Sequence, residues 1–131
     1  MKKIILKALR KINGVLNLKN ISLINDKKIN TKNIGEISLI YKNKKIKLSK
    51  IFSIKIIKTQ KEMNEINIKG CNSFCNSLGY KWKKDILTVE SNLGSYVGNK
   101  MQGGKIRVKG SVEDFLGSGM LGGKIIIRGN A

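Results

Sequence analysis

The sequence predicts an all-β fold whose C-terminal part, residues 66–131, is a short parallel β-helix of about 19-residue coils. Two observations lead to this prediction. Glycine is concentrated in the last third of the chain, where residues 94–131 hold ten of the 14 glycines. In the same region two consecutive stretches of 19 residues resemble each other. Glycine loses more conformational entropy on folding than other residues, so its concentration needs a structural reason, and the repeat supplies one.

The repeat becomes visible when its two copies are aligned. Residues 92–110 read NLGSYVGNKMQGGKIRVKG, and residues 111–129 read SVEDFLGSGMLGGKIIIRG. Three further pairs keep apolar character, as inward-facing positions require: Tyr96/Phe115, Val97/Leu116 and Val108/Ile127. The copies share seven identities at a constant offset of 19 residues: Gly98/Gly117, Met101/Met120, Gly103/Gly122, Gly104/Gly123, Lys105/Lys124, Ile106/Ile125 and Gly110/Gly129.

Each copy contains short apolar stretches, such as DFLG and KIIIRG, separated by a glycine-rich corner. A continuous helix would not tolerate so many glycines, whereas a coil of about three strand segments, each stacked about 4.8 Å from its copy, would. Equivalent apolar residues should then form interior ladders made of Trp82, Met101, Met120, Ile106, Ile125, Val108 and Ile127. Glycines should stand at coil corners that require positive φ, namely Gly98, Gly103, Gly104, Gly110, Gly117, Gly122, Gly123 and Gly129.

Two earlier stretches extend the pattern toward the N-terminus. Residues 76–91 form a degenerate third copy, in which Trp82 aligns with Met101 at the same offset. The segment INIKG at residues 66–70 resembles the end of another copy, displaced by about two residues.

Residues 1–65 do not repeat, and we treat them as an N-terminal capping segment with short strands. The stretch NIGEISLIYKNKKIKLSKIF suggests two short strands joined by a turn at residues 42–44, and LKALRKI suits either a short helix or a strand. An open end of a β-helix exposes strand edges and apolar side chains, so a cap is expected there.

Composition limits the classes of function. The chain of 131 residues is about one domain long and has no apolar run that could cross a membrane, and we assign it no export signal. Histidine is absent, which removes the commonest general base and imidazole metal ligands. Cys71 and Cys75 are two thiols without further metal ligands, so we interpret them as reduced cysteines of a cytoplasmic protein, and we expect no metal site.

The formal net charge of +19 invites an interpretation as a nucleic-acid-binding protein. However, Lys, Ile and Asn make up 59 residues, and these are the amino acids that an AT-rich coding sequence supplies in excess. The chain also has few aromatic residues for base stacking. We favour the compositional explanation, with nucleic-acid binding as the alternative.

The stretch GSGMLGG at residues 117–123 matches the G-x-G-x-x-G spacing of a dinucleotide-binding loop. That motif needs a helix after it and an acidic residue about 20 positions further on. Here a strand-like KIIIRG follows, and Lys100 replaces Gly119 in the sister copy. We therefore predict no cofactor-binding residues in this loop.

The repeat pattern G-x-x-M-x-G-G-x-I-x-V-x-G, present as GNKMQGGKIRVKG and GSGMLGGKIIIRG, resembles the C subunit of formylmethanofuran dehydrogenase and of the related bacterial formyltransferase/hydrolase complex. More distantly it is similar to the C-terminal β-helix domain of glutamate synthase, the GXGXG superfamily. The resemblance is strong over residues 76–131 and weaker before them. It implies that the β-helix is right-handed and belongs to a complex that moves formyl groups between tetrahydromethanopterin, methanofuran or its analogue, and formate or carbon dioxide.

The resemblance also implies a non-catalytic scaffold subunit. In that family the chemistry lies in formyltransferase and amidohydrolase-type subunits, which would be the partners, and in archaea in a molybdenum or tungsten pterin subunit. We therefore expect no catalytic residue and no cofactor in this chain. The alternatives are a glutamate-synthase-type structural module and an enzyme that uses Glu113 and Asp114 or the two cysteines, although adjacent carboxylates on a strand point to opposite faces.

Members of the family commonly continue for several more coils. We expect the last coil here, which ends in GNA, to have a bare face. A partner could cover that face, the protein could be a shortened or degraded relative, or the sequence could be incomplete.

Overall fold

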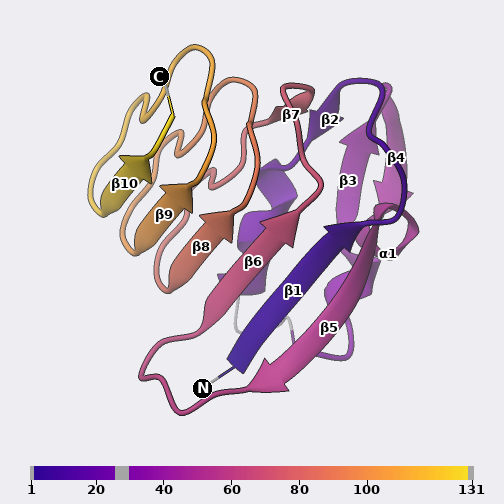
Figure 1. Cartoon of the computed structure of the whole chain (residues 1–131), viewed down its shortest axis with the longest axis horizontal. Coiled ribbons are helices and arrows are strands. Elements are labelled where there is room, and N and C mark those ends of the chain that lie inside the picture. Colours follow the sequence, from indigo (N-terminus) through magenta and orange to yellow (C-terminus); the bar gives the residue numbers. More distant parts are fainter. Residues whose placement is uncertain (1, 26–29, 130–131) are drawn as a thin grey trace.

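Two β-sheets form the fold, with helical turns at one end (Figure 1). The computed structural model describes residues 2–25 and 30–129; Asn130 and Ala131 of the trailing GNA lie outside them. None of the helices within these two ranges is long and apolar enough to span a membrane. In chain order the elements are β1 (Lys2–Ala8), β2 (Leu16–Asn17), the 3₁₀ turns η1 (Lys19–Asn25) and η2 (Ile34–Glu36), β3 (Ser38–Tyr41), β4 (Lys44–Lys47), α1 (Leu48–Ile51), β5 (Phe52–Lys58), β6 (Glu65–Lys69), β7 (Cys75–Asn76), β8 (Ile86–Val89), β9 (Lys105–Val108) and β10 (Lys124–Ile127).

The larger sheet has six strands in the order β10-β9-β8-β6-β1-β5. Strands β6, β8, β9 and β10 run parallel, and Leu87 pairs with Ile106, which pairs with Ile125. This register confirms the 19-residue repeat and its third copy. Ile66 pairs with Leu87, which confirms that INIKG is displaced by two residues.

Strand β1 joins the repeats to the N-terminal segment. It pairs in parallel with β6 and antiparallel with β5, so strands from both sides of residue 65 share one sheet. The sequence KKIILKA alternates, because Ile4 and Leu6 are buried whereas Lys3, Ile5 and Lys7 between and beside them are half-buried or exposed. This period of two explains why residues 2–8 form a strand. Of LKALRKI, for which a helix or a strand was expected, only Leu6, Lys7 and Ala8 belong to this strand, and residues 9–12 are neither helix nor strand.

The smaller sheet has the order β4-β3-β2-β7. Strands β3 and β4 pair antiparallel around Lys42 and Asn43, which both have positive φ. This hairpin confirms the predicted strand pair and its turn. Strand β2 then pairs in parallel with β7, which ties the N-terminal segment to the loop between β6 and β8.

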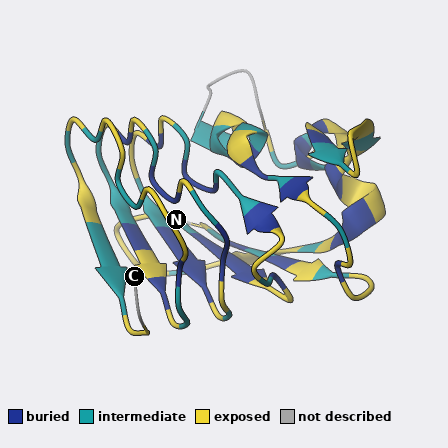
Figure 2. Cartoon of the chain, turned by 90° about the horizontal axis from the view of Figure 1, so that it is seen from above, coloured by how far each residue is buried: buried dark blue, intermediate teal, exposed yellow. Residues whose placement is uncertain are grey.

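One apolar core fills the space behind the six-stranded sheet (Figure 2). It continues from the N-terminal segment, where Leu18 and Phe52 are buried, into the repeats, where Trp82 and Met101 are buried. The indole N–H of Trp82 donates to the backbone carbonyl of Asp85 at 3.1 Å, so this large side chain is buried with its polar group satisfied.

The predicted fold class, an all-β right-handed parallel β-helix over residues 66–131, is wrong. The described residues form a mixed α/β structure with two sheets that contain both parallel and antiparallel pairs, together with helical segments. Each repeat contributes one strand of four residues to the large sheet, where about three strand segments were predicted.

The reason lies in the backbone between the strands. Four positions of each repeat have positive φ, and these positions recur at the 19-residue offset. Residues in this conformation cannot continue an extended strand, so the chain turns repeatedly and only one strand per repeat remains. The positions are Ser77/Tyr96/Phe115, Gly79/Gly98/Gly117, Lys81/Lys100/Gly119 and Asp85/Gly104/Gly123.

Gly104 provides a test of this packing. Its φ is +75°, and an added Cβ would lie 2.7 Å from the backbone oxygen of Asp85. Gly117 has a similar φ of +65°, but its nearest neighbour would be the Met120 sulfur at 3.6 Å. Gly117→Ala should cost about 1 kcal/mol of unfolding free energy from backbone strain, and Gly104→Ala should cost at least about 1 kcal/mol more. Urea denaturation measures both, and equal losses would contradict the proposed close approach.

Candidate functional site

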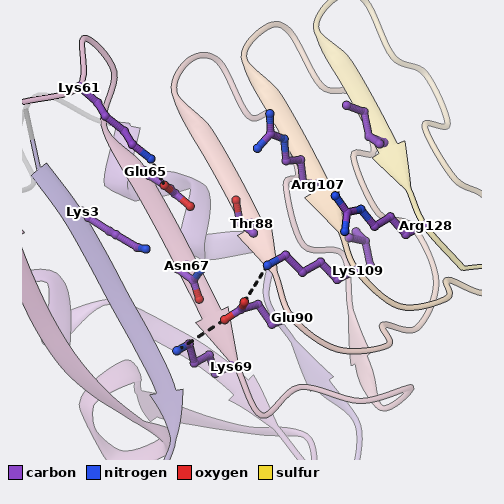
Figure 3. Close-up of a pocket in the computed structure, with 12 residues that line it drawn as sticks. Lys3, Lys61, Glu65, Asn67, Lys69, Thr88, Glu90, Arg107, Lys109 and Arg128 are labelled. Carbon is purple, nitrogen blue, oxygen red and sulfur yellow. Dashed lines mark hydrogen bonds and ion pairs between the residues drawn. The ribbon is translucent and has the colours of Figure 1, made fainter. Parts of the chain in front are cut away.

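A hollow lined by charged side chains lies on the outer face of the six-stranded sheet (Figure 3). We call it the basic groove; its volume is about 540 Å³. The lining contains six basic and two acidic side chains together with Asn67, Thr88, Val108 and Ile126. The charged residues are Lys3, Lys61, Lys69, Arg107, Lys109, Arg128, Glu65 and Glu90.

Strand register places these side chains in rows across the sheet. Ile66 and Ile68 face the core, so the residues that alternate with them, Glu65, Asn67 and Lys69, face outward. The middle row runs through paired positions from Ile5 to Asn67, Thr88, Arg107 and Ile126. Polar groups therefore occupy the centre of this row, with Ile5 and Ile126 on either side of them, and Lys55 of β5 continues the row beyond Ile5.

The next row contains a shared ion pair. The Lys109 Nζ atom donates to Glu90 Oε1 at 2.8 Å, and Lys69 Nζ lies 3.5 Å from Glu90 Oε2. Figure 3 shows both contacts. The hydrogen bond from Lys109, with a smaller contribution from Lys69, lowers the pKa of Glu90 below its ordinary value of 4.5.

The glycines predicted to stand at coil corners divide into two sets. Gly98, Gly104, Gly117 and Gly123 have positive φ. The other four lie where the neighbouring repeat approaches closely: at Gly122, an added Cβ would lie 2.6 Å from the backbone oxygen of Gln102. That second set is Gly103, Gly110, Gly122 and Gly129.

The residues predicted to form the interior ladders lie along the core, with burial that falls toward β10. Trp82, Met101, Ile106 and Val108 are buried. Their equivalents in the last described repeat, Met120, Ile125 and Ile127, are only partly buried. Figure 2 shows the same decrease: the edge strand β10 is teal and yellow without dark blue, whereas β9 and β8 contain dark blue. This repeat also exposes Phe115 and Leu121.

The alternative catalytic residues lie outside the lining of the basic groove. Cys71 and Cys75 are both buried free thiols, and the hydrogen bond between them raises the pKa of Cys71 and lowers that of Cys75. Glu113 and Asp114 are exposed and lie away from the groove lining. Within residues 2–25 and 30–129, no three His, Cys, Asp or Glu side chains come together as a metal site.

Sequence reasoning did not identify the basic groove. Its residues come from β1, the loop before β6 and four repeats, and the high overall lysine content hid their grouping. One signal was available: Arg107/Ile126 and Lys109/Arg128 alternate in the repeat with the apolar ladder positions Ile106/Ile125 and Val108/Ile127, which indicates that they face outward. Only the pairing of β1 with β6 brings Lys3 to the same face.

The chain was compared with known proteins. No protein-family model and no curated protein matches it. A solved structure that does resemble it is a chain of the formyltransferase/hydrolase complex (FhcABCD) from Methylorubrum extorquens in complex with methylofuran, with a TM-score of 0.81 and 22% identity. The alignment covers 95% of this chain and 46% of that chain, so this chain spans about half of its neighbour's length. At this identity the likeness establishes a shared fold.

The Glu90 ion pairs predict a pH dependence of stability. Because folding lowers the pKa of Glu90, its contribution is present above about pH 4.5 and disappears as the pH falls through the lowered pKa. Glu90→Gln should therefore cost roughly 0.2–1 kcal/mol of unfolding free energy at pH 7, and the difference from the parent should vanish in acid. Urea denaturation between pH 7 and pH 3 measures it.

Glu113→Gln is the matched control, because Glu113 forms no ion pair in the described part of the chain. It should leave stability nearly unchanged at both ends of the pH range. A Glu90→Gln protein as stable as the parent at pH 7 would contradict the role of the ion pairs.

Proposed function

We propose that this chain is a non-catalytic scaffold subunit of a formyl-transferring complex related to the formyltransferase/hydrolase complex. The observation that carries the proposal is the fold likeness, which covers 95% of the chain at a TM-score of 0.81. The repeat motif, which resembles that of the C subunit, supports the same conclusion from the sequence alone.

The arrangement of side chains supports a scaffold role. The described residues contain no histidine and no group of three potential metal ligands, and their two thiols are buried. Chemistry would therefore reside in partner subunits: a formyltransferase subunit and a metal-dependent amidohydrolase subunit, with methanofuran or an analogue as the formyl carrier. We favour this branch over the archaeal dehydrogenase branch, which adds a molybdenum or tungsten pterin subunit.

An apolar surface beside β10 is suited to contact with a partner. Phe115 stacks on Tyr96 with ring centroids 4.7 Å apart, and both rings are exposed. Leu121 is 82% exposed and comes just before the edge strand β10. Exposed apolar groups of this kind, next to an edge strand, are typical of protein–protein contacts.

Affinity purification of the tagged chain from its source cells tests the proposed function. Mass spectrometry should identify a formyltransferase subunit and an amidohydrolase-type subunit in stoichiometric amounts. Recovery of the chain without either subunit would overturn the proposal.

Substitution of Leu121 tests the surface. Leu121→Asp should reduce recovery of the partner subunits about tenfold or more, because burial of a carboxylate at an apolar contact is costly. Met63→Asp is the control, since Met63 is an exposed apolar residue in the loop between β5 and β6. Equal recovery with the two variants would exclude the surface as a contact.

A further inference from the structure

Two buried side-chain oxygen atoms in the floor of the basic groove find no hydrogen-bond partner among the residues that the structure describes. Asn67 is 5% exposed and Thr88 is 4% exposed, and they pair directly on the adjacent strands β6 and β8. Within the described residues, neither the Asn67 Oδ1 atom nor the Thr88 Oγ1 atom has a partner. Unsatisfied buried polar atoms cost stability, so this pair at the floor of a hollow offers two hydrogen-bond positions to a bound molecule.

The charge around these two groups is not compensated. Glu65 lies within 4.0 Å of Lys61, and Glu90 is shared by Lys69 and Lys109. Over the two described ranges, Lys3, Arg107 and Arg128 have no carboxylate within ion-pair distance. Figure 3 shows Lys3 extending toward Asn67 from one side of the floor and Arg107 lying on the other side. The groove therefore offers free positive charge around a polar floor.

We propose that the basic groove binds a small organic anion that carries a phosphate or carboxylate group together with an O–H or N–H donor. Arg107 and Lys3 bind the anionic group, since a guanidinium matches phosphate and carboxylate geometry. Asn67 Oδ1 can only accept, so the ligand must also donate a hydrogen bond. Ile126, which pairs with Arg107 on the outer face, gives the organic part an apolar contact, and a volume of about 540 Å³ suits a small molecule.

The lining favours a small anion over a nucleic acid. None of the side chains that line the groove is aromatic, so bases have no stacking surface there. Two glutamates also line the groove and would repel a continuous phosphate backbone. The proposal concerns this chain alone and does not depend on the proposed scaffold role.

A titration followed by ¹⁵N–¹H NMR at pH 7 and constant ionic strength tests the proposal. The probes are inorganic phosphate, sulfate, glycerol 3-phosphate and glycerate. Phosphate retains an O–H group at this pH and sulfate has none, so phosphate should bind more tightly. The side-chain amide of Asn67 and the backbone amide of Thr88 should shift saturably, and glycerol 3-phosphate and glycerate show which anionic group is preferred.

Three variants separate the groove from general electrostatics. Arg107→Gln should weaken phosphate binding about tenfold or more, because a charge-assisted hydrogen bond is lost. Lys105→Gln removes the same charge from the same strand but lies outside the lining, so it should change affinity less than twofold. Asn67→Leu should abolish the preference for phosphate over sulfate, and the NMR spectrum of each variant reports whether it is folded.

Several outcomes would overturn the proposal. These are the absence of saturable shifts at Asn67 and Thr88 with every probe, equal binding of sulfate and phosphate, and equal effects of Arg107→Gln and Lys105→Gln. Salt-dependent binding of a DNA duplex that shifts these amides, with no response to phosphate, would also overturn it and would assign the face to nucleic acid.

Discussion

The parallel pairing of β8, β9 and β10 at an offset of 19 residues is the constraint on which the rest of the structure depends. Backbone hydrogen bonds hold this offset between the strands and also within the turns, where the N–H of Lys81 donates to Asn99 and that of Lys100 donates to Ser118. Every repeat therefore presents equivalent residues at the same height. Because the spacing is constant, buried residues, residues with positive φ and glycines close to the neighbouring backbone all recur every 19 residues.

The groove on the outer face follows from the same spacing. Equivalent positions of neighbouring strands lie side by side. A charged residue at the end of one strand therefore lies beside the charged residues at the ends of the adjacent strands, as Glu90 lies between Lys69 and Lys109. A carboxylate in that row offsets two ammonium groups that would otherwise repel each other. In the middle row the paired residues Asn67 and Thr88 cannot compensate Arg107, so its charge stays available.

The repeat and the alternation of apolar and polar residues predicted the strand register and the hairpin, which depend on residues close together in the sequence or on equivalent positions of the repeats. The repeat of Ile106 and Ile125 predicted the register, and alternation around Lys42 and Asn43 predicted the hairpin. The fold class was wrong because the φ of Tyr96 and Lys100 is positive although neither is a glycine, so residue type alone did not reveal how often the chain turns. The groove could not be predicted, since it needs Lys3 beside residues far away in the sequence, and pairings of that kind leave no local signal.

The position of β1 has a consequence for how the chain reaches its native state. Ile4 pairs with Ile56 on one side and with Ile66 on the other, so β1 has both of its neighbours only after more than half of the chain is available. Such non-local contacts slow folding, because the loop entropy is lost before the contacts form. During synthesis, KKIILKA would remain unpaired until β5 is available, and the four-residue strands β8, β9 and β10 would add to the sheet only after β6 had joined it.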